Sequence, residues 1–450
     1  MPDLVVRNAA VLAMDDSVAS EDLDSAVANA DLRIRDGQLL EIGTVVAQAE
    51  DIEFDATGLL ALPGFVQGHV HYCQTLFRGL ADDLSLIDWL QERIWPMEAA
   101  HDADTTRLSA QLSVTELLRG GTTTTQVMES VHHAEVSFAV ARDSRMLTIL
   151  GNCLMDVAGP GVPPDWVTTR SEAMEMVADL HLEFDGLAGR LHYAISPRFI
   201  LSCSDELSRE AADYATAHDL RIHTHADEHL DEVGLVRQQT GKEYILALES
   251  LGLLTARTTL AHCVHTSTAE RDALQAAGST IAHCPTTNLK LGSGLAPIAD
   301  YQARGIPISL GADGAACNNR LSALAEIRQA ALVAAAQTGP GHWPADRALR
   351  AATIGGAEAL GVADEVGSLQ VGKRADLVLM RQPDPECKPT HRELVSHIVY
   401  TAETEDIRHV LVGGEWCVRD GVSTTQDTDR LSSEQRQQLP ALLSRAGLSR

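Results

Sequence analysis

Eight apolar or threonine-rich runs, each of strand length, recur over residues 64–314, and helical patterns separate most of them. The runs are GFVQGHVH, TTTTQVM, LTILGNCLM, RLHYAISPRF, LRIHTHADE, TTLAHCVH, STIAHCP and IPISLGADG. Alternation of strands and helices predicts a parallel sheet, and eight such units predict an α/β fold of the (β/α)8 TIM-barrel type. A doubly wound sheet is the alternative, but the G-x-G-x-x-G fingerprint of that fold is missing.

Short strands and glycine turns flank the eight runs. Residues 1–62 alternate loosely and contain Asp36-Gly37 as a hairpin turn, and similar strands return over residues 367–425. We expect these two segments to pair into a small β-sandwich domain beside a catalytic barrel of residues 63–366. Residues 426–450 combine polar residues with apolar residues at helical spacing, which predicts a C-terminal helical tail.

Charge and cysteine usage limit the possible partners. The chain has 35 Lys and Arg against 63 Asp and Glu, so its formal net charge is −28. Such a field repels nucleic acid and anionic membranes, and we exclude both as partners. We find no signal peptide and no run of about 18 apolar residues that would span a membrane. Eight scattered cysteines without a C-x-x-C pair are typical of reduced, buried cysteines in a cytoplasmic protein.

Polar residues stand at the ends of the runs, where barrels of this type carry their active sites. The residues in these positions are His69, His71, Arg198, His223, His225, Asp227, Glu228, His262, His283 and Asp313. Histidine ends four of the eight runs, although only 18 of the 450 residues are histidines. This gathering predicts an active site rather than a set of unrelated core histidines.

His69 and His71 indicate a metal site. On a strand, residues i and i+2 point to the same face, and neutral imidazole is a common zinc ligand. With one histidine of the fifth run and Asp313, they supply the three or so ligands that a catalytic divalent cation needs beside an open position. Such a cation lowers the pKa of water to about 7. Glu228 is close enough in sequence to be the acid–base partner.

The lysines argue for one metal ion and not two. A second ion in barrels of this type often needs a carbamylated lysine after an early strand, and the first of the four lysines is Lys242. A carboxylate bridge such as Glu129 is the alternative. We expect His223 to face the helix layer.

Five motifs occur together: HVH (69–71), HTHADE (223–228), AHCVH (261–265), AHCPTTNLKLGSG (282–294) and LGADGA (310–315). In this combination the chain resembles the amidohydrolase superfamily, in its deaminase and chlorohydrolase branch, over nearly its whole length. The resemblance implies a cytoplasmic enzyme of purine metabolism, often a homo-oligomer, that acts on a small heterocyclic substrate. It also implies one divalent metal ion, zinc or iron.

The resemblance further implies roles for single residues. The implied metal ligands are His69, His71, His225 and Asp313. Glu228 would shuttle a proton to a ring nitrogen, His262 would orient the attacking water, and Asp313 would accept a proton from that water. The implied reaction is hydrolytic deamination, in which hydroxide generated at the metal attacks the carbon that bears the amino group and ammonia leaves.

The substrate motifs point two ways. Gln74 and the segment SPRFILSCSDEL resemble the guanine deaminases, in which an arginine, here Arg198, binds the purine carbonyl. LGADGAACNN resembles the adenosine-type deaminases, in which an acid before a tryptophan, here Asp88 before Trp89, holds the ribose hydroxyls. The alternative role of Trp89 is to pack a helix against its neighbours. His283 either contacts substrate or makes a hydrogen bond at the end of its strand.

Arg198 favours a guanine-like substrate over an adenosine-type one, because a guanidinium offers a fork of donors to a carbonyl oxygen. The alternative is that Arg198 pairs with a nearby acid such as Asp227 or Asp231. We expect a deaminase of an aminopurine or related fused ring, with a guanine-like base favoured. An adenosine-type nucleoside deaminase acting on methylthioadenosine, S-adenosylhomocysteine or deoxyadenosine is the first alternative, and a triazine chloro- or aminohydrolase is the second.

Overall fold

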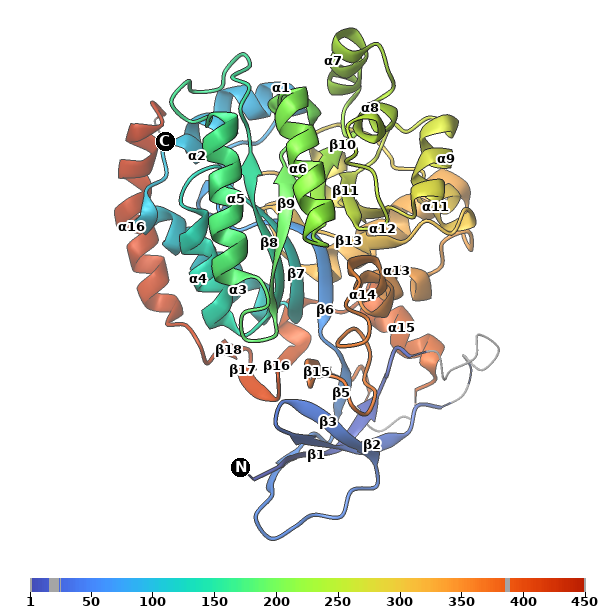
Figure 1. The fold of residues 1–450 in the computed structure, drawn as a ribbon. Helices are drawn as coiled ribbons and strands as arrows, with labels where there is room; N and C mark the ends of the chain where they lie inside the picture. Colours follow the sequence, from blue (N-terminus) through green and yellow to red (C-terminus); the bar gives the residue numbers. More distant parts are fainter. Residues whose placement is uncertain (1, 16–23, 25, 385–388, 449–450) are drawn as a thin grey trace. The chain divides into compact units, whose positions relative to one another are not determined.

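The predicted parallel sheet is present in the structure, a computed structural model that describes residues 2–15, 24, 26–384 and 389–448 (Figure 1). Its strands in chain order are β6 (Phe65–His71), β7 (Thr122–Glu129), β8 (Leu147–Leu154), β9 (Leu191–Pro197), β10 (Arg221–Ala226), β11 (Thr258–His262), β12 (Thr280–His283), β13 (Ile308–Leu310) and β14 (Asp313–Gly314). Every residue of β6, β7 and β8 is buried. Burial on both faces explains why these strands read as continuous runs without alternation.

The eighth predicted run closes the sheet into a barrel. It forms two short strands, of which β13 pairs in parallel with β12 and β14 pairs in parallel with β6, the first strand. Gly311 and Ala312 are the only residues between β13 and β14. A Cβ atom at Gly311 would lie 2.6 Å from the carbonyl oxygen of His69, so glycine permits this close approach. The predicted (β/α)8 barrel is confirmed.

Helices follow the barrel strands. Those between β6 and β14 are α1 (Leu86–Trp89), η2 (Leu90–Ile94), α2 (Trp95–Ala99), α3 (Ala103–Arg119), α4 (Ala134–Ser144), α5 (Arg170–Phe184), α6 (Asp205–Ala217), α7 (Leu230–Thr240), α8 (Tyr244–Ser250), α9 (Thr268–Ala277), α10 (Pro285–Lys290) and α11 (Ile298–Ala303), with 3-10 turns η1 (Thr75–Phe77) and η3 (Ile200–Ser202). Ser204 caps α6, because its hydroxyl accepts a hydrogen bond from the backbone N–H of Leu207 at 3.1 Å.

A second, mixed sheet joins the two ends of the chain. Its strands are β1 (Leu4–Val11), β2 (Asn29–Arg35), β3 (Gln38–Gly43), β4 (Ile52–Asp55), β5 (Leu59–Pro63), β15 (Leu377–Arg381), β16 (Ile407–Val412), β17 (Glu415–Arg419) and β18 (Val422–Ser423). The two segments meet where β5 pairs antiparallel with β15. Asp36 and Gly37 connect β2 to β3 with φ angles of 49° and 82°, as a tight hairpin turn requires. The small β domain built from both termini is therefore present.

The remaining helices are α12 (Ala323–Thr338), α13 (Ala345–Ala351), α14 (Ile354–Leu360), α15 (His391–Tyr400), η4 (Thr404–Asp406) and α16 (Thr428–Arg445). The chain divides into two compact units, one of residues 1–67, 115–124 and 322–427, and one of residues 68–114, 125–321 and 428–450. The residues of the candidate site described below all belong to the second unit. The domain boundaries predicted from sequence stay predictions.

Within the second unit, α16 packs on the helices that follow β6. Its side chains Leu431, Leu439 and Leu442 share one apolar cluster with Trp89 and Trp95. Arg445 adds a hydrogen bond from Nε to the carbonyl oxygen of Ala100 and an ion pair with Asp102. The C-terminal helix therefore stabilises the segment from α1 to α2.

None of the helices in the described part of the chain is both long and apolar enough to cross a membrane. Seven of the eight cysteines are described, and all seven are buried thiols that form no disulfide with one another. Cys387 lies outside the described residues.

Candidate active site

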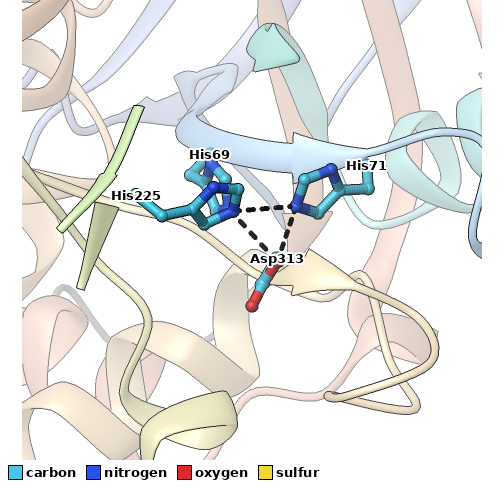
Figure 2. A group of neighbouring side chains, drawn as sticks. All are labelled: His69, His71, His225 and Asp313. Atoms are coloured by element: carbon cyan, nitrogen blue, oxygen red, sulfur yellow. Dashed lines mark hydrogen bonds and ion pairs between the residues drawn. The ribbon is translucent and has the colours of Figure 1, made fainter. Parts of the chain in front are cut away.

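Four side chains from three strands converge at the C-terminal ends of the barrel strands (Figure 2). His69 and His71 lie on β6, His225 on β10 and Asp313 at the start of β14. Asp313 Oδ1 lies 3.2 Å from the Nε2 atoms of both His69 and His71, and His225 Nε2 lies 3.3 Å from His71 Nε2. One potential ligand atom from each of the four side chains lies within 4.8 Å of the others. The sequence-predicted ligand set is thus brought together.

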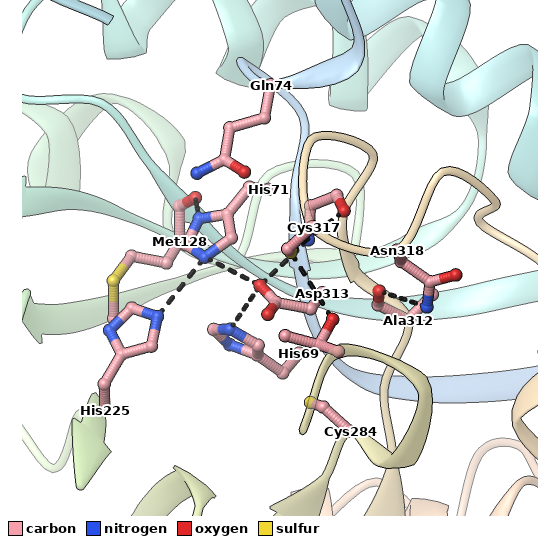
Figure 3. A network of polar contacts seen from close by, with 12 residues as sticks. His69, His71, Gln74, Met128, His225, Cys284, Ala312, Asp313, Cys317 and Asn318 are labelled. Atoms are coloured by element: carbon pink, nitrogen blue, oxygen red, sulfur yellow. Dashed lines mark hydrogen bonds and ion pairs between the residues drawn. The ribbon is translucent and has the colours of Figure 1, made fainter. Parts of the chain in front are cut away.

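Hydrogen bonds on the outer side of the His71 and His225 rings determine which ring nitrogens face the centre of the cluster. His71 Nδ1 donates to the carbonyl oxygen of Met128 at 2.8 Å (Figure 3). His225 Nδ1 donates to the carbonyl oxygen of Arg198 at 2.6 Å. A carbonyl oxygen only accepts, so the proton sits on Nδ1 and the Nε2 lone pairs of both rings face each other. Such an arrangement is unfavourable unless a cation lies between the lone pairs.

Burial keeps the imidazoles of His69 and His225 neutral. It lowers the pKa of His69 to about 4 and the pKa of His225 well below its usual value. Asp313, by contrast, raises the pKa of His71, although burial acts in the opposite direction. His69 Nε2 is buried and makes no hydrogen bond to any described residue. Neutral imidazole nitrogens and a carboxylate are the donors that zinc and related divalent ions prefer. The four residues therefore fit a single divalent cation, and Glu129 is not one of the four.

His223 also belongs to this centre, which corrects the expectation that it faces the helix layer. Its Nε2 atom lies 2.9 Å from His69 Nδ1, and the ring is fully buried. The physical reason is that His223 and His225 are two residues apart on β10, so both side chains point to the barrel interior. His223 binds Nδ1 of His69, the ring nitrogen that faces away from the cluster. In the same way, the carbonyl oxygens of Met128 and Arg198 bind Nδ1 of His71 and of His225.

Glu228 lies beside the cluster in a position to exchange protons. Its Oε2 atom is 3.5 Å from His262 Nε2, and Ser293 Oγ donates to its Oε1 at 3.4 Å. Burial, together with the negative charges of Asp313 and Glu232, raises the pKa of Glu228 well above its usual value. A carboxyl group of this kind can hold a proton near neutral pH and release it to a substrate.

His262 and Asp313 are held by strained backbone. Both residues have left-handed φ angles, 73° for His262 and 60° for Asp313, although neither is glycine. Such conformations cost free energy and are found mainly where the structure needs a side chain in one direction. Here they direct His262 Nε2 to within 3.9 Å of Asp313 Oδ2.

A cavity opens beside these groups. Its polar wall includes His71, His225, Glu228, His262 and Asp313. Its apolar wall consists of Leu86, Ile87, Trp89, Leu90, Phe199 and Leu291. A concave, mostly apolar pocket with a few convergent polar groups is typical of a site for a small organic ligand.

Three of the five residues predicted to contact substrate line the cavity, and the other two are not among its described lining residues. Gln74, Trp89 and Arg198 line the cavity. Asp88 is exposed and accepts a hydrogen bond from Ser85 Oγ at 2.9 Å. His283 is buried, and its two ring nitrogens make no hydrogen bond to any described residue. Neither Asp88 nor His283 is among the described residues that line this cavity. Their roles toward a substrate stay predictions.

Arg198 pairs with an acid that the sequence reasoning missed. Its NH1 and NH2 atoms donate to Glu98 Oε2 at 2.6 Å and to Glu98 Oε1 at 3.1 Å, and Gln74 Nε2 donates to the same Oε1 at 2.9 Å. The partner is neither Asp227 nor Asp231. Glu98 stands in the stretch WPMEA of α2, and a lone acid among apolar residues was the available sequence signal.

Comparisons with known proteins identify the family. The model of the amidohydrolase family matches residues 60–417. A 5-methylthioadenosine/S-adenosylhomocysteine deaminase of Haloarcula marismortui is 35% identical over 99% of this chain and 97% of its own length. An adenosine deaminase of Xanthomonas campestris, solved with bound zinc, superposes with a TM-score of 0.88 at 29% identity, over 98% of this chain and 99% of its own.

The structure of E. coli guanine deaminase superposes with a TM-score of 0.82 at 27% identity, over 93% of this chain and all of its own. The prediction of a metal-dependent enzyme of the deaminase type on a TIM barrel is confirmed by these relatives and by the His/Asp cluster. With a family match that spans most of its residues, the chain belongs to the amidohydrolase family.

Proposed function

We propose that this chain is a deaminase of adenosine-type nucleosides, such as methylthioadenosine, S-adenosylhomocysteine or deoxyadenosine. The prediction that favoured a guanine-like base is not confirmed, and the relatives support its alternative better. The observation that carries the proposal of deamination is Glu228, a buried carboxyl with a raised pKa that lines the cavity beside His262 and Asp313.

We assign the metal ligands to His69, His71, His225 and Asp313. The cation is zinc, which the Xanthomonas relative contains, with iron as the alternative. When bound, zinc acts as a Lewis acid and lowers the pKa of water to about 7. The remaining chemistry belongs to side chains of the chain.

Each of three side chains has one task in the proposed reaction. Asp313 accepts a proton from the attacking water through Oδ2, the oxygen that faces His262. His262 orients that water through Nε2. Glu228 donates a proton to the purine ring nitrogen next to the carbon under attack. Asp313 then passes its proton to the amino nitrogen, the carbon–nitrogen bond breaks, and ammonia leaves. Water supplies the new carbonyl oxygen, and the proton of the new hydroxyl group returns to Glu228, so both carboxyl groups regain their starting states.

The pairing of Arg198 supports a nucleoside over an oxo-purine. The argument for guanine requires a guanidinium fork that is free to bind the purine carbonyl. Both terminal nitrogens of Arg198 are already bound to Glu98. The apolar wall of the cavity, by contrast, suits an uncharged 5′ substituent such as a methylthio group.

A panel assay tests the proposal. Zinc-loaded protein is incubated separately with methylthioadenosine, S-adenosylhomocysteine, 5′-deoxyadenosine, adenosine, guanine and an aminotriazine, and ammonia release is measured. The proposal predicts ammonia from the nucleosides. Release from guanine alone, or from the triazine alone, would overturn it. The predictions of a homo-oligomer and of a cytoplasmic location stay predictions.

A further inference from the structure

His262 depends on a residue that lies behind it, away from the metal cluster. Its Nδ1 atom donates a hydrogen bond of 2.9 Å to Oδ1 of Asn288, and each of the two side chains is only 1% exposed. Asn288 lies on α10, the short helix that follows β12. The contact therefore links the ends of two neighbouring barrel strands.

The contact decides which nitrogen of His262 carries the proton. An amide oxygen only accepts, so the proton sits on Nδ1 and Nε2 keeps its lone pair. Nε2 is buried and makes no hydrogen bond to any residue that the structure describes. It faces Glu228 Oε2 at 3.5 Å and Asp313 Oδ2 at 3.9 Å. A water molecule bound among these atoms would donate to Nε2 and be held in one orientation.

We infer that Asn288 is a positioning residue that fixes the tautomer and orientation of His262. A neutral amide suits this task better than a carboxylate, because a carboxylate would favour the charged imidazolium. A charged ring would carry a proton on Nε2 and would no longer accept a hydrogen bond from the water. The inference rests on the proposed function, since it names a residue that serves the same site.

The surroundings of Asn288 indicate that its side chain serves the site and not the fold. Its backbone is held at both ends, because its N–H donates to the carbonyl oxygen of Cys284 at 3.0 Å and its own carbonyl oxygen accepts from Gly294 N–H at 3.2 Å. Its side-chain nitrogen Nδ2, however, is buried without a hydrogen-bond partner among the described residues. An unmade buried donor lowers stability, so packing alone does not favour an amide here.

The test compares two substitutions at position 288 with a neighbouring control. Asn288→Leu keeps the shape of the side chain but removes the acceptor, and Asn288→Asp keeps an acceptor in the same place. Thr287→Val is the control, because Thr287 lies on the same helix, is equally buried, and donates its hydroxyl hydrogen bond to Cys317 Sγ and not to His262. Metal content and thermal unfolding are measured for all variants to identify any that fail to fold.

For Asn288→Leu we expect kcat on the preferred nucleoside to fall about 10- to 100-fold, as is typical when a supporting hydrogen bond is lost. KM should change by less than about threefold, because Asn288 is not among the described residues that line the cavity. Asn288→Asp should recover part of the loss, and Thr287→Val should match the wild type. Unchanged kcat in folded, metal-loaded Asn288→Leu would overturn the inference.

A spectroscopic readout separates this inference from the proposed function. Protein labelled with ¹⁵N-histidine is examined by NMR, and the His262 signal is assigned by its loss in His262→Gln. Wild type should show the proton on Nδ1 alone, Asn288→Asp should keep Nδ1 protonated with a larger share of the charged imidazolium, and Asn288→Leu should lose the preference for Nδ1. Retention of the Nδ1–H tautomer in Asn288→Leu would contradict the inference. If the wild type released no ammonia from any nucleoside, the proposed function would fail. The NMR experiment would still test whether Asn288 fixes the tautomer of His262.

Discussion

Arg198 and Glu98 form a fully buried, two-point ion pair at the edge of the candidate active site. Gln74 also donates to this carboxylate, so two side chains, Arg198 and Gln74, share Glu98. Arg198 holds the pKa of Glu98 below its usual value, although burial acts in the opposite direction. Arg198 also supplies the carbonyl oxygen that fixes His225, so the pair connects the cavity wall to the metal cluster.

The first prediction concerns the stability of this pair. Arg198→Met should lower the free energy of unfolding by about 3–5 kcal/mol, because it leaves Glu98 charged and buried without a partner. The double variant Arg198→Met/Glu98→Gln should recover much of that loss. Urea denaturation monitored by circular dichroism measures both. Equal stability of the single and double variants would show that the two side chains do not depend on each other.

The second prediction concerns the proton shuttle. Glu228→Gln keeps the size of the side chain but cannot donate a carboxyl proton, so kcat should fall by about 10²- to 10⁴-fold. Metal content should stay at the wild-type value, because Glu228 is not in the His/Asp cluster. Steady-state assays and metal analysis of the same preparation check the two statements. Near-full activity would remove Glu228 from this role.

The third prediction concerns the metal. Dialysis against a chelator should abolish ammonia release, and added zinc should restore it. His71→Ala should lose most of the bound metal, because His71 Nε2 lies within 3.3 Å of two other cluster atoms. His133→Ala replaces a half-buried histidine directly before α4, outside the cluster; it is the matched control and should keep both metal and activity. Equal metal content in the two variants would contradict the assigned ligand set.

The fourth prediction concerns Glu129, a buried carboxyl at the end of β7 that the proposed chemistry does not use. Burial raises its pKa from 4.5 to about 7. The folded state therefore binds more protons than the unfolded state between these values, so stability falls as pH rises through this window. By pH 8 the cost to the folded state is about 3 kcal/mol, since each pK unit corresponds to about 1.4 kcal/mol.

Replacing Glu129 with glutamine removes this cost. Glu129→Gln should stabilise the protein at pH 8 and have little effect at pH 5, as measured by denaturant unfolding at both pH values. Glu135→Gln, an exposed acid on α4, serves as control and should change stability by less than about 0.5 kcal/mol at either pH. A loss of stability in Glu129→Gln at pH 8 would indicate that the charged carboxylate has a partner.

The barrel and the metal cluster were predictable because they follow from local rules. Parallel strands end at the same edge of a barrel, so His69, His71, His225 and Asp313 had to approach one another once the eight runs were read as strands. The i, i+2 rule applied to His223 and His225 would also have placed His223 inside, and the expectation for His223 failed because that rule was not followed.

The partner of Arg198 was not predictable in the same way. Glu98 precedes Arg198 by 100 residues and lies on a short helix after β6, so their contact depends on how that helix packs. The apolar cluster of α16 with Trp89 and Trp95 determines this packing, and it joins segments more than 300 residues apart. Tertiary contacts of this kind leave no periodic pattern in a single sequence.

The most direct test of the central claim is a competition assay. Zinc-loaded wild-type protein receives methylthioadenosine and guanine together at equal concentration, and chromatography follows both deaminated products. The product ratio at low conversion gives the ratio of the two kcat/KM values. We predict that methylthioadenosine is favoured by at least about 100-fold, as expected when a site is built for one substrate class. Equal use of both substrates, or preference for guanine, would contradict the assignment to adenosine-type nucleosides.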